Sequence, residues 1–382
     1  MRVVMFYHSL VSDWNHGNAH FLRGIVSELQ ARGHSVSVLE PANGWSRQNL
    51  LEEQGTPAIA RFRRAYPNLT SRCYRIETLD LDQELEGADL VLVHEWNDPA
   101  LVEAVGRHRA LVGGYQLLFH DTHHRSLTAP ETMAAYQLQH YDGVLAFGEV
   151  VRCRYLDAGW ASRAWTWHEA ADVRRFRPLS GRPNEGDLVW IGNWGDEERS
   201  AELEEFLIKP VEQLGLRARI HGVRYPPAAL RRLEEAWIDY AGWLPNFDVP
   251  DGFARFRMTL HIPRRPYVEA LPGIPTIRVF EALACGIPLI CAPWDDAENL
   301  FSPGEDYLIA RDGKEMQEHI RTLLANPDAA AAMARRGRHK ILARHTCSQR
   351  VTELLGIVNQ LRGVEAGDDV GYLGPERVRE AS

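Results

Sequence analysis

Residues 271–293, LPGIPTIRVFEALACGIPLICAP, hold a turn, a helix and a strand in the order typical of an α/β sheet. Two prolines and a glycine in the first five positions predict the turn. Residues 276–285 predict a short helix, and Gly286 stands where a helix-ending glycine belongs. Residues 287–292 are apolar and predict a strand that ends before Pro293. This stretch therefore favours an α/β fold.

The start of this helix is suited to holding a phosphate group. A loop that leads into a helix presents free backbone N–H groups and the positive end of the helix dipole. Arg278 and Glu281 lie three residues apart, so they share one face of the helix. The arginine could pair with a phosphate, and the glutamate could accept hydrogen bonds from sugar hydroxyls. An ordinary surface Arg–Glu pair explains the same residues equally well.

Length and charge limit the classes of partner. A chain of 382 residues with 45% hydrophobic and 25% charged residues predicts two globular domains. The formal net charge of −9 disfavours nucleic acid and anionic membranes as partners. The apolar run at the N-terminus is too short to span a membrane, so we expect no transmembrane segment. An anionic ligand would need a local cluster of arginines and helix ends.

The cysteines and acidic pairs give no sign of a metal site. Five cysteines, an odd number, are widely spaced and form no CxxC pair. We therefore expect no disulfide framework, no bound metal or other cofactor, and a location in the reducing cytoplasm. Asp80 and Asp82 have the DxD spelling of some metal sites, but the acidic residues that follow are typical of a helix start.

The first half of the chain alternates apolar strands with helices. Residues 3–7, 36–39, 90–93, 115–119 and 145–147 predict strands, which such alternation makes parallel. The loop after the first strand lacks GxGxxG, which disfavours a nicotinamide dehydrogenase. Ligands bind at the carboxyl ends of parallel strands. Polar residues occupy these ends on three strands and could converge on one crevice, although each alone is better explained as a loop residue: His8, His94, Glu95, His120 and Asp121.

The alternation restarts after a Pro/Gly-rich linker at residues 180–187. We expect an N-terminal domain over 1–175, a C-terminal domain over 186–345, and a crossover helix with a tail over 346–382. A long helix is expected over 202–214. The loop with Gly192, Asn193 and Gly195 could hold a diphosphate through its backbone N–H groups. Arg264, after a later strand, could add positive charge beside it.

Several segments resemble known glycosyltransferases. IPTIRVFEALACGIPLI, LFSPGEDYLIA and ARHTCSQRV, within residues 273–352, resemble the C-terminal part of the CgeB-type (spore-maturation-like) family. EALACGIPLI, DVRRFRP and FHDTHH resemble segments of the wider GT-B fold enzymes. This resemblance implies two Rossmann-like, doubly wound parallel-sheet domains that face each other across a cleft. It also implies that the C-terminal helix packs back on the N-terminal domain.

The resemblance implies an activity and roles for single residues. The enzyme would move a sugar, with a hexose expected, from a nucleoside-diphosphate sugar to a glycan, lipid, protein or small-molecule acceptor. The first domain would hold the acceptor and the second the donor, with retention of configuration and without a metal. Glu281 would bind the ribose, and His120 would lie near the donor sugar. The backbone at Pro275, Thr276 and Ile277, and the loop from Gly192 to Gly195, would meet the diphosphate.

The chain also departs from that pattern. A glutamate expected eight positions before Glu281 is replaced by Gly273, and Glu269 lies out of register. The usual phosphate-binding lysine is missing, so Arg278, Arg264 or Arg265 would supply the charge. An inverting enzyme would need a base, for which His120, Asp121, Glu95 and Asp13 are candidates. Two other functions stay open: a sugar-nucleotide epimerase or hydrolase, and a non-catalytic carbohydrate-binding or coat protein, which the absent glutamate favours.

Overall fold

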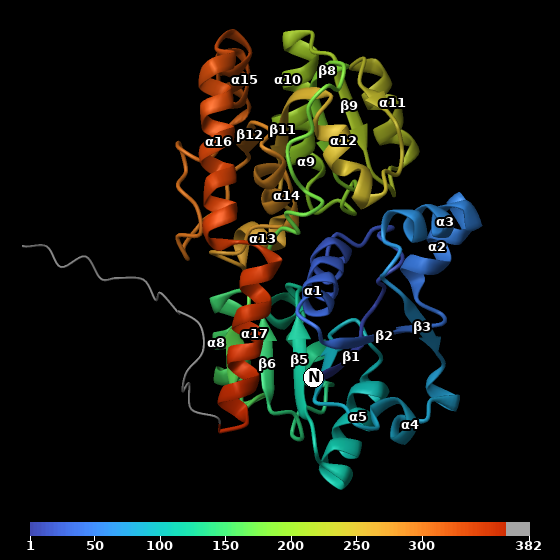
Figure 1. Cartoon of the computed structure of the whole chain (residues 1–382). Coiled ribbons are helices and arrows are strands. Elements are labelled where there is room, and N and C mark those ends of the chain that lie inside the picture. Colours follow the sequence, from blue (N-terminus) through green and yellow to red (C-terminus); the bar gives the residue numbers. More distant parts are fainter. Residues whose placement is uncertain (364–382) are drawn as a thin grey trace, which may run out of the picture.

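The structure is a computed structural model that describes residues 1–363, and it contains two α/β domains, one above the other in Figure 1. The first domain is built on a seven-stranded sheet in the order β3-β2-β1-β4-β5-β6-β7, with every pair parallel. Its strands are β1 (Arg2–Phe6), β2 (Ser35–Pro41), β3 (Ser71–Tyr74), β4 (Leu90–His94), β5 (Gln116–Asp121), β6 (Gly143–Ala146) and β7 (Ala164–Thr166).

The second domain repeats this plan with six parallel strands in the order β10-β9-β8-β11-β12-β13. The first six strands of each domain therefore follow the same doubly wound 3-2-1-4-5-6 order. This arrangement confirms the predicted fold class. The strands are β8 (Gly186–Ile191), β9 (Ala218–His221), β10 (Asp239–Tyr240), β11 (Phe256–His261), β12 (Leu289–Cys291) and β13 (Leu308–Ile309).

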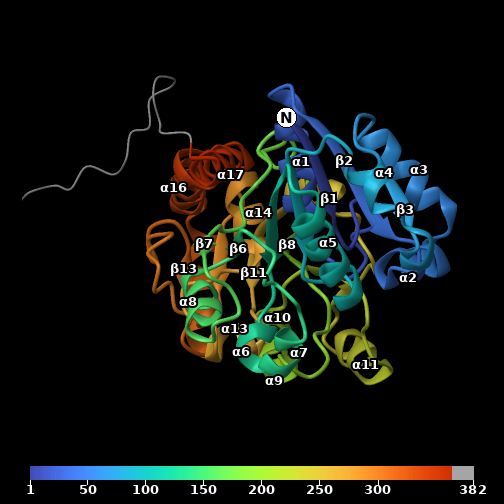
Figure 2. The same ribbon diagram turned by 90° about the horizontal axis from the view of Figure 1, so that it is seen from below.

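Alternation along β1 shows how helices cover both faces of the first sheet. Val3 and Met5 belong to the same apolar cluster as Ile25 of α1 (Ala19–Ala31). Val4 belongs to a different cluster, with Val102 of α5 (Pro99–Val112). Successive side chains of a strand point to opposite faces, so α1 and α5 lie on opposite sides of the sheet, as Figure 2 shows. Burial on both faces is what a parallel sheet requires.

The remaining helices complete the two layers around each sheet. In the first domain they are α2 (Trp45–Gln54), α3 (Thr56–Ala65), α4 (Leu81–Leu85), α6 (Arg125–Thr128), α7 (Pro130–Ala134) and α8 (Glu149–Asp157). In the second they are α9 (Ser200–Leu203), α10 (Lys209–Leu214), α11 (Pro227–Glu235), α12 (Val249–Phe253), α13 (Arg265–Glu269), α14 (Ile277–Cys285), α15 (Gly313–Ala325) and α16 (Pro327–Arg344). Short 3₁₀ turns lie at Ile76–Thr78 and Asn246–Asp248.

The stretch 271–293 folds as a turn, a helix and a strand, as predicted. Thr276 precedes α14, and Gly286 ends it in the left-handed conformation (φ 67°). The strand β12 is shorter than expected and begins after Pro288. Proline has no N–H to donate to the neighbouring strand, which explains the late start.

The helical stretch expected over 202–214 is confirmed, and it contains a π-helical turn that the sequence did not predict. A π-helical turn at Glu204–Ile208 separates α9 from α10. Pro210 lies just after this turn and has no N–H for the hydrogen bond to the carbonyl four residues earlier. The helix therefore widens at this point, which is how π turns arise inside helices.

The C-terminal helix α17 (Cys347–Leu361) leaves the second domain and runs along the first (Figure 1). It packs beside α1, and the Nε1–H of Trp167 donates to the carbonyl oxygen of Arg350 at 2.9 Å. The predicted return of this helix is confirmed, whereas the tail residues 364–382 lie outside the described part. Among residues 1–363 no helix is both long enough and apolar enough to cross a membrane.

Candidate active site

A cleft of about 590 Å³ lies between the two domains. The carboxyl ends of strands from both sheets line it, because both sheets point these ends at the interface. The first domain contributes residues that follow β1, β4, β5 and β6, and the second contributes residues at the ends of β8, β9 and β11 and at the start of α14. This is the edge at which doubly wound sheets bind ligands.

Most residues predicted to bind a donor come together along the second-domain wall. The cleft-lining members of that set are Gly192, Asn193, Arg264, Thr276, Ile277 and Arg278. Gly195, Pro275 and Glu281 are not part of the lining. Gly192 is needed where it stands, because a Cβ there would lie 2.6 Å from the ring of Trp190. Asn193 fixes the same loop by accepting from the backbone N–H of Val223 at 3.0 Å.

Arg199 is a donor-side residue that the sequence did not single out. Its guanidinium lines the cleft and donates to the carbonyl oxygens of Ile262, at 2.9 Å, and Asn193. It forms no ion pair with a carboxylate in the described part of the chain, unlike Arg264, which pairs with Glu198 at 3.2 Å. Burial, together with nearby arginines, lowers the pKa of Arg199 to about 10, which leaves it charged at neutral pH. The loop thus carries a half-buried cation that has no ion-pair partner within residues 1–363.

Glu281 lies beneath the cleft wall, with no exposed surface. His20 Nε2 accepts from the backbone N–H of Asp172 at 2.8 Å, so Nδ1 carries the proton and donates it to Glu281 at 2.9 Å. Asn246 Nδ2 donates at 2.5 Å, and Arg278 pairs with the other carboxylate oxygen. Burial alone raises the pKa of Glu281, but Arg278 and the two hydrogen bonds bring it below the ordinary value. The carboxylate therefore holds two cleft-lining side chains, those of Arg278 and Asn246.

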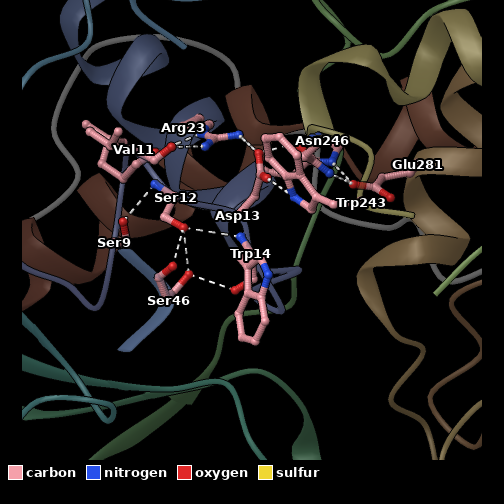
Figure 3. Close-up of polar contacts among 12 residues, drawn as sticks. Ser9, Val11, Ser12, Asp13, Trp14, Arg23, Ser46, Trp243, Asn246 and Glu281 are labelled. Carbon is pink, nitrogen blue, oxygen red and sulfur yellow. Dashed lines mark hydrogen bonds and ion pairs between the residues drawn. The ribbon is translucent and has the colours of Figure 1, made fainter. Parts of the chain in front are cut away.

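Asp13 connects the two domains across the cleft (Figure 3). Its carboxylate accepts from Trp243 Nε1 at 3.1 Å and from the backbone N–H of Asn246 at 3.0 Å. Arg23, of the first domain, donates to it at 2.8 Å. Asn246 thus bonds to Asp13 through its backbone and to Glu281 through its side chain. The loop after β1 is in this way linked to the helix α14.

The histidines at the strand ends form a packed cluster beneath the cleft floor. His120 contacts Tyr7 through Nδ1, and its ring centre lies 5.4 Å from that of His94. Burial lowers the pKa of His120 to about 3, so its ring is neutral. Asp121 is also fully buried and accepts from Tyr155 OH at 2.9 Å. Neither His120 nor Asp121 lines the cleft, so their catalytic roles stay predictions.

Glu95 is the third predicted catalytic residue, and it is not part of the cleft lining. It is fully buried, pairs with Arg125 and borders a second cavity inside the first domain. Burial, followed by the neighbouring Asp121, raises its pKa above the ordinary value. Asp13 is the remaining base candidate and does line the cleft, but its oxygens already accept three hydrogen bonds.

Glu169 is a second residue that sequence reasoning missed. It lies in the crossing between β7 and β8, lines the cleft and is 7% exposed. Its carboxyl group makes no hydrogen bond or ion pair with residues 1–363, in contrast to the carboxylates of Asp13, Glu95 and Glu281. Burial, and then the charge of Glu281, raise the pKa of Glu169 to about 8. No motif marks this residue, and its position in the crossing is the only signal that could have suggested it.

Comparisons with known proteins give the fold a name. Residues 199–356 match a family described as glycosyl transferase-like. Sucrose-phosphate synthase from Thermosynechococcus elongatus matches with a TM-score of 0.66 and 15% identity, over 96% of this chain and 100% of that one. This chain has the GT-B fold.

Two further GT-B structures were determined with nucleotides bound. HepE of Anabaena, in complex with UDP and glucose, matches with a TM-score of 0.65 and 12% identity, over 94% of this chain and 100% of that one. T4 phage BGT, in complex with UDP-glucose, matches with a TM-score of 0.57 and 12% identity, over 94% and 99%. No curated protein matches the sequence. The narrower CgeB-type relationship stays a prediction.

Gly273 shows why the expected glutamate is missing from this GT-B cleft. The residue has φ 88°, a conformation that favours glycine, and a Cβ there would lie 2.5 Å from Cγ of Glu298. Glu298 in turn accepts from His168 and from the backbone N–H of Glu149, both in the first half of the chain. The space that a side chain at 273 would need is therefore used for contact between the domains.

The described part of this GT-B chain has histidines and carboxylates in its cleft, but they do not form a cluster of metal ligands. Within residues 1–363 no three His, Cys, Asp or Glu side chains are grouped to hold an ion. Asp80 of the DxD lookalike is the N-cap of α4 and accepts from the backbone N–H of Gln83 at 3.0 Å. The predicted helix start is thus confirmed.

Proposed function

We propose that this protein transfers a sugar from a nucleoside-diphosphate sugar to an acceptor hydroxyl. The observation that carries the proposal is Arg199, a half-buried cation that has no ion-pair partner within residues 1–363, beside the Gly192 loop and the start of α14. Such a group is costly to bury unless an anion joins it. Guanidinium groups and helix N-termini are the usual partners of phosphates. The UDP and UDP-glucose complexes of GT-B relatives support the same substrate class.

The reaction needs a route for the negative charge that develops on the leaving group. The acceptor oxygen bonds to the anomeric carbon of the sugar, while the bond from that carbon to the diphosphate oxygen breaks. The bonding electrons leave with the nucleoside diphosphate. Arg199, Arg264 and Arg278 line the cleft and would stabilise this charge. We therefore propose that no metal is needed.

Retention of configuration is part of the proposal. His120, Asp121 and Glu95 do not line the cleft, and Asp13 already accepts three hydrogen bonds that hold it in place. A retaining enzyme needs no separate base, because the proton of the acceptor hydroxyl passes to the departing diphosphate oxygen. Glu169 would be mostly protonated at neutral pH and would hydrogen-bond to the donor sugar, for which a hexose is proposed.

A cytoplasmic location completes the proposal. All five cysteines are free, and three of them, Cys285, Cys291 and Cys347, are buried. Free thiols are typical of a reducing compartment.

Product analysis tests the proposal directly. The full chain is incubated with UDP-, GDP-, dTDP- and ADP-hexoses, with and without a panel of hydroxyl acceptors, and the products are identified by mass spectrometry. The proposal predicts release of nucleoside diphosphate that depends on an acceptor, with the acceptor gaining one sugar residue. Free sugar alone, or an epimerised donor, would establish hydrolase or epimerase activity instead. Donor binding without turnover would indicate a non-catalytic carbohydrate-binding protein.

A further inference from the structure

A second cavity of about 560 Å³ lies inside the first domain, next to the cleft. We call it the tryptophan cavity, because Trp45 and Trp96 border both it and the cleft. The two spaces therefore share a wall made by these rings. The cavity is also lined by His8 and by five charged residues: Arg75, Glu77, Glu95, Asp98 and Arg125.

Trp45 and Trp96 form an aromatic wall that also carries hydrogen-bond donors. Their ring centres lie 6.4 Å apart at an angle of 71°, so each ring presents a different face. Both side chains are half-buried, and neither indole N–H has a hydrogen-bond partner within residues 1–363. An aromatic face with a free N–H beside it suits a sugar ring, which has apolar C–H faces and hydroxyl groups at its edge.

The position of Trp45 is fixed by the loop that also carries Asp13. Ser46, its neighbour, donates to the carbonyl oxygen of Trp14 at 2.7 Å and hydrogen-bonds with Ser12 at 2.9 Å (Figure 3). Asp13, between them, reaches the second domain through Trp243 and Asn246. The wall of the tryptophan cavity is thus held by the same segment that links the domains.

His8 adds an independent sign of a ligand. It follows β1, is 2% exposed and lies over Trp45 with ring centres 4.7 Å apart. Its Nε2 has no hydrogen-bond partner among the described residues, although buried polar atoms are normally paired. Burial lowers the pKa of His8 to about 4, so the ring is neutral and suited to a hydroxyl group.

The charges around the tryptophan cavity narrow the class of ligand. Acidic residues outnumber arginines there, and Arg125 already pairs with Glu95. This balance disfavours phosphorylated ligands and nucleic acids. A lipid is disfavoured as well, because none of the large exposed hydrophobic side chains of residues 1–363 borders the cavity. A neutral molecule rich in hydroxyl groups fits best.

We propose that the tryptophan cavity binds a saccharide, which is the acceptor of the transfer reaction. Its sugar rings would lie against Trp45 and Trp96, with His8 hydrogen-bonded to a hydroxyl group. The reacting hydroxyl would extend past the two tryptophans into the cleft, where it forms the new bond as described above. This inference rests on the proposed function and names its acceptor class.

Calorimetry on the full chain tests the inference. The probes are maltotriose, cellotriose, mannotriose and galactobiose, titrated with and without UDP, GDP, dTDP or ADP. We expect at least one saccharide to bind, and its affinity to fall tenfold or more in Trp45→Ala, Trp96→Ala and His8→Ala. Trp45→Phe keeps an aromatic face and should retain part of the affinity. Trp237→Ala is the matched control, because Trp237 is 90% exposed on the second domain and borders no described cavity.

The outcomes separate this inference from the proposed function. Nucleotide binding without binding of any saccharide would overturn the inference and leave the proposed function standing. Saccharide binding that the three variants do not weaken would also overturn it, because the site would lie elsewhere. Saccharide binding that depends on the tryptophans, without any nucleotide binding, would support the cavity and overturn the transferase. Binding of phospholipid vesicles or an oligonucleotide in place of saccharides would overturn the acceptor class.

Discussion

Two buried carboxylates on either side of one cleft wall differ in almost every respect. Glu281, on α14, accepts from His20, Asn246 and Arg278, and its pKa is lowered. Glu169, in the crossing between the domains, has no partner within residues 1–363, and its pKa is raised to about 8. Glu281 is closed off, whereas Glu169 lines the cleft. Glu281, which a sequence motif marks, is thus held in a buried network, whereas Glu169, which no motif marks, lines the cleft without a partner within residues 1–363.

The largest effect is expected from removing Glu281. Glu281→Ala should lower the free energy of unfolding by about 3–5 kcal/mol, since it leaves Arg278 and His20 without their buried partner. Urea denaturation measures this loss. Glu269→Ala is the matched control, because Glu269 is exposed and has no ion pair within the described residues, and it should change stability by less than about 0.5 kcal/mol.

The same variant also tests the ribose role. The GT-B resemblance predicts that Glu281→Ala weakens nucleotide binding strongly. If stability falls but nucleotide affinity is unchanged, Glu281 only holds the cleft together. A stability loss below about 1 kcal/mol would instead show that the buried network contributes little.

The next largest effect is expected on nucleotide affinity when Arg199 is replaced. Arg199→Gln should weaken nucleoside-diphosphate binding roughly 10- to 100-fold, because hydrogen bonds to a charged group contribute about 1.5–3 kcal/mol. Arg265→Gln serves as the control, since Arg265 pairs with Glu202 and does not line the cleft. Equal affinities for the two variants, measured by calorimetry, would remove Arg199 from the donor site.

Removing the contacts of Asp13 with the second domain should have a smaller effect on nucleotide affinity. Asp13→Ala removes the acceptor for Trp243 and for the backbone N–H of Asn246, so the segment that carries them loses its contact with the first domain. We expect faster amide hydrogen exchange at residues 243–246 and a roughly threefold loss of nucleotide affinity. Asp328→Ala, an exposed substitution on α16, should change neither quantity. Unchanged exchange in Asp13→Ala would mean that other contacts hold the domains together.

The smallest effect is the pH dependence of Glu169. Its raised pKa means that the folded state keeps this proton up to about pH 8, whereas the unfolded state releases it near the ordinary value. Stability from this group is therefore full below the unfolded pKa and is lost as pH rises toward 8. The melting temperature of Glu169→Gln should be roughly 2–4 °C above that of the parent at pH 9. At pH 4 the two proteins should have the same melting temperature. The same difference in melting temperature at pH 4 and pH 9 would show that Glu169 does not titrate as described. Glu269→Gln is the control, because Glu269 is exposed.

Local patterns explain why much of the fold could be predicted. The turn, helix and strand of residues 271–293 depend on apolar spacing, Gly286 and the prolines, all of which are visible in the sequence. The strand–helix alternation follows from the same kind of pattern, whereas the return of α17 was implied by the GT-B resemblance. The π turn before Pro210 was missed because a proline early in a helix is also compatible with an ordinary start.

The site was less predictable because burial and partners arise only in the folded chain. His120 follows a strand as predicted, yet its ring packs under the floor against Tyr7 and His94. Arg199 becomes a cleft residue only because its loop folds back onto Ile262. Neither outcome depends on neighbouring residues in the sequence, so spacing alone does not reveal it.

Binding of a nucleoside diphosphate in the cleft can be tested by one thermal-shift experiment. UDP, GDP, dTDP, ADP and CMP are added to the parent chain and to Arg199→Gln at equal concentrations. We expect one nucleoside diphosphate to stabilise the parent, by about 2.7 kcal/mol at a hundred times its dissociation constant, and to stabilise Arg199→Gln much less. If no nucleotide stabilises the parent, or both proteins respond equally, the assignment of this cleft as a donor site is contradicted.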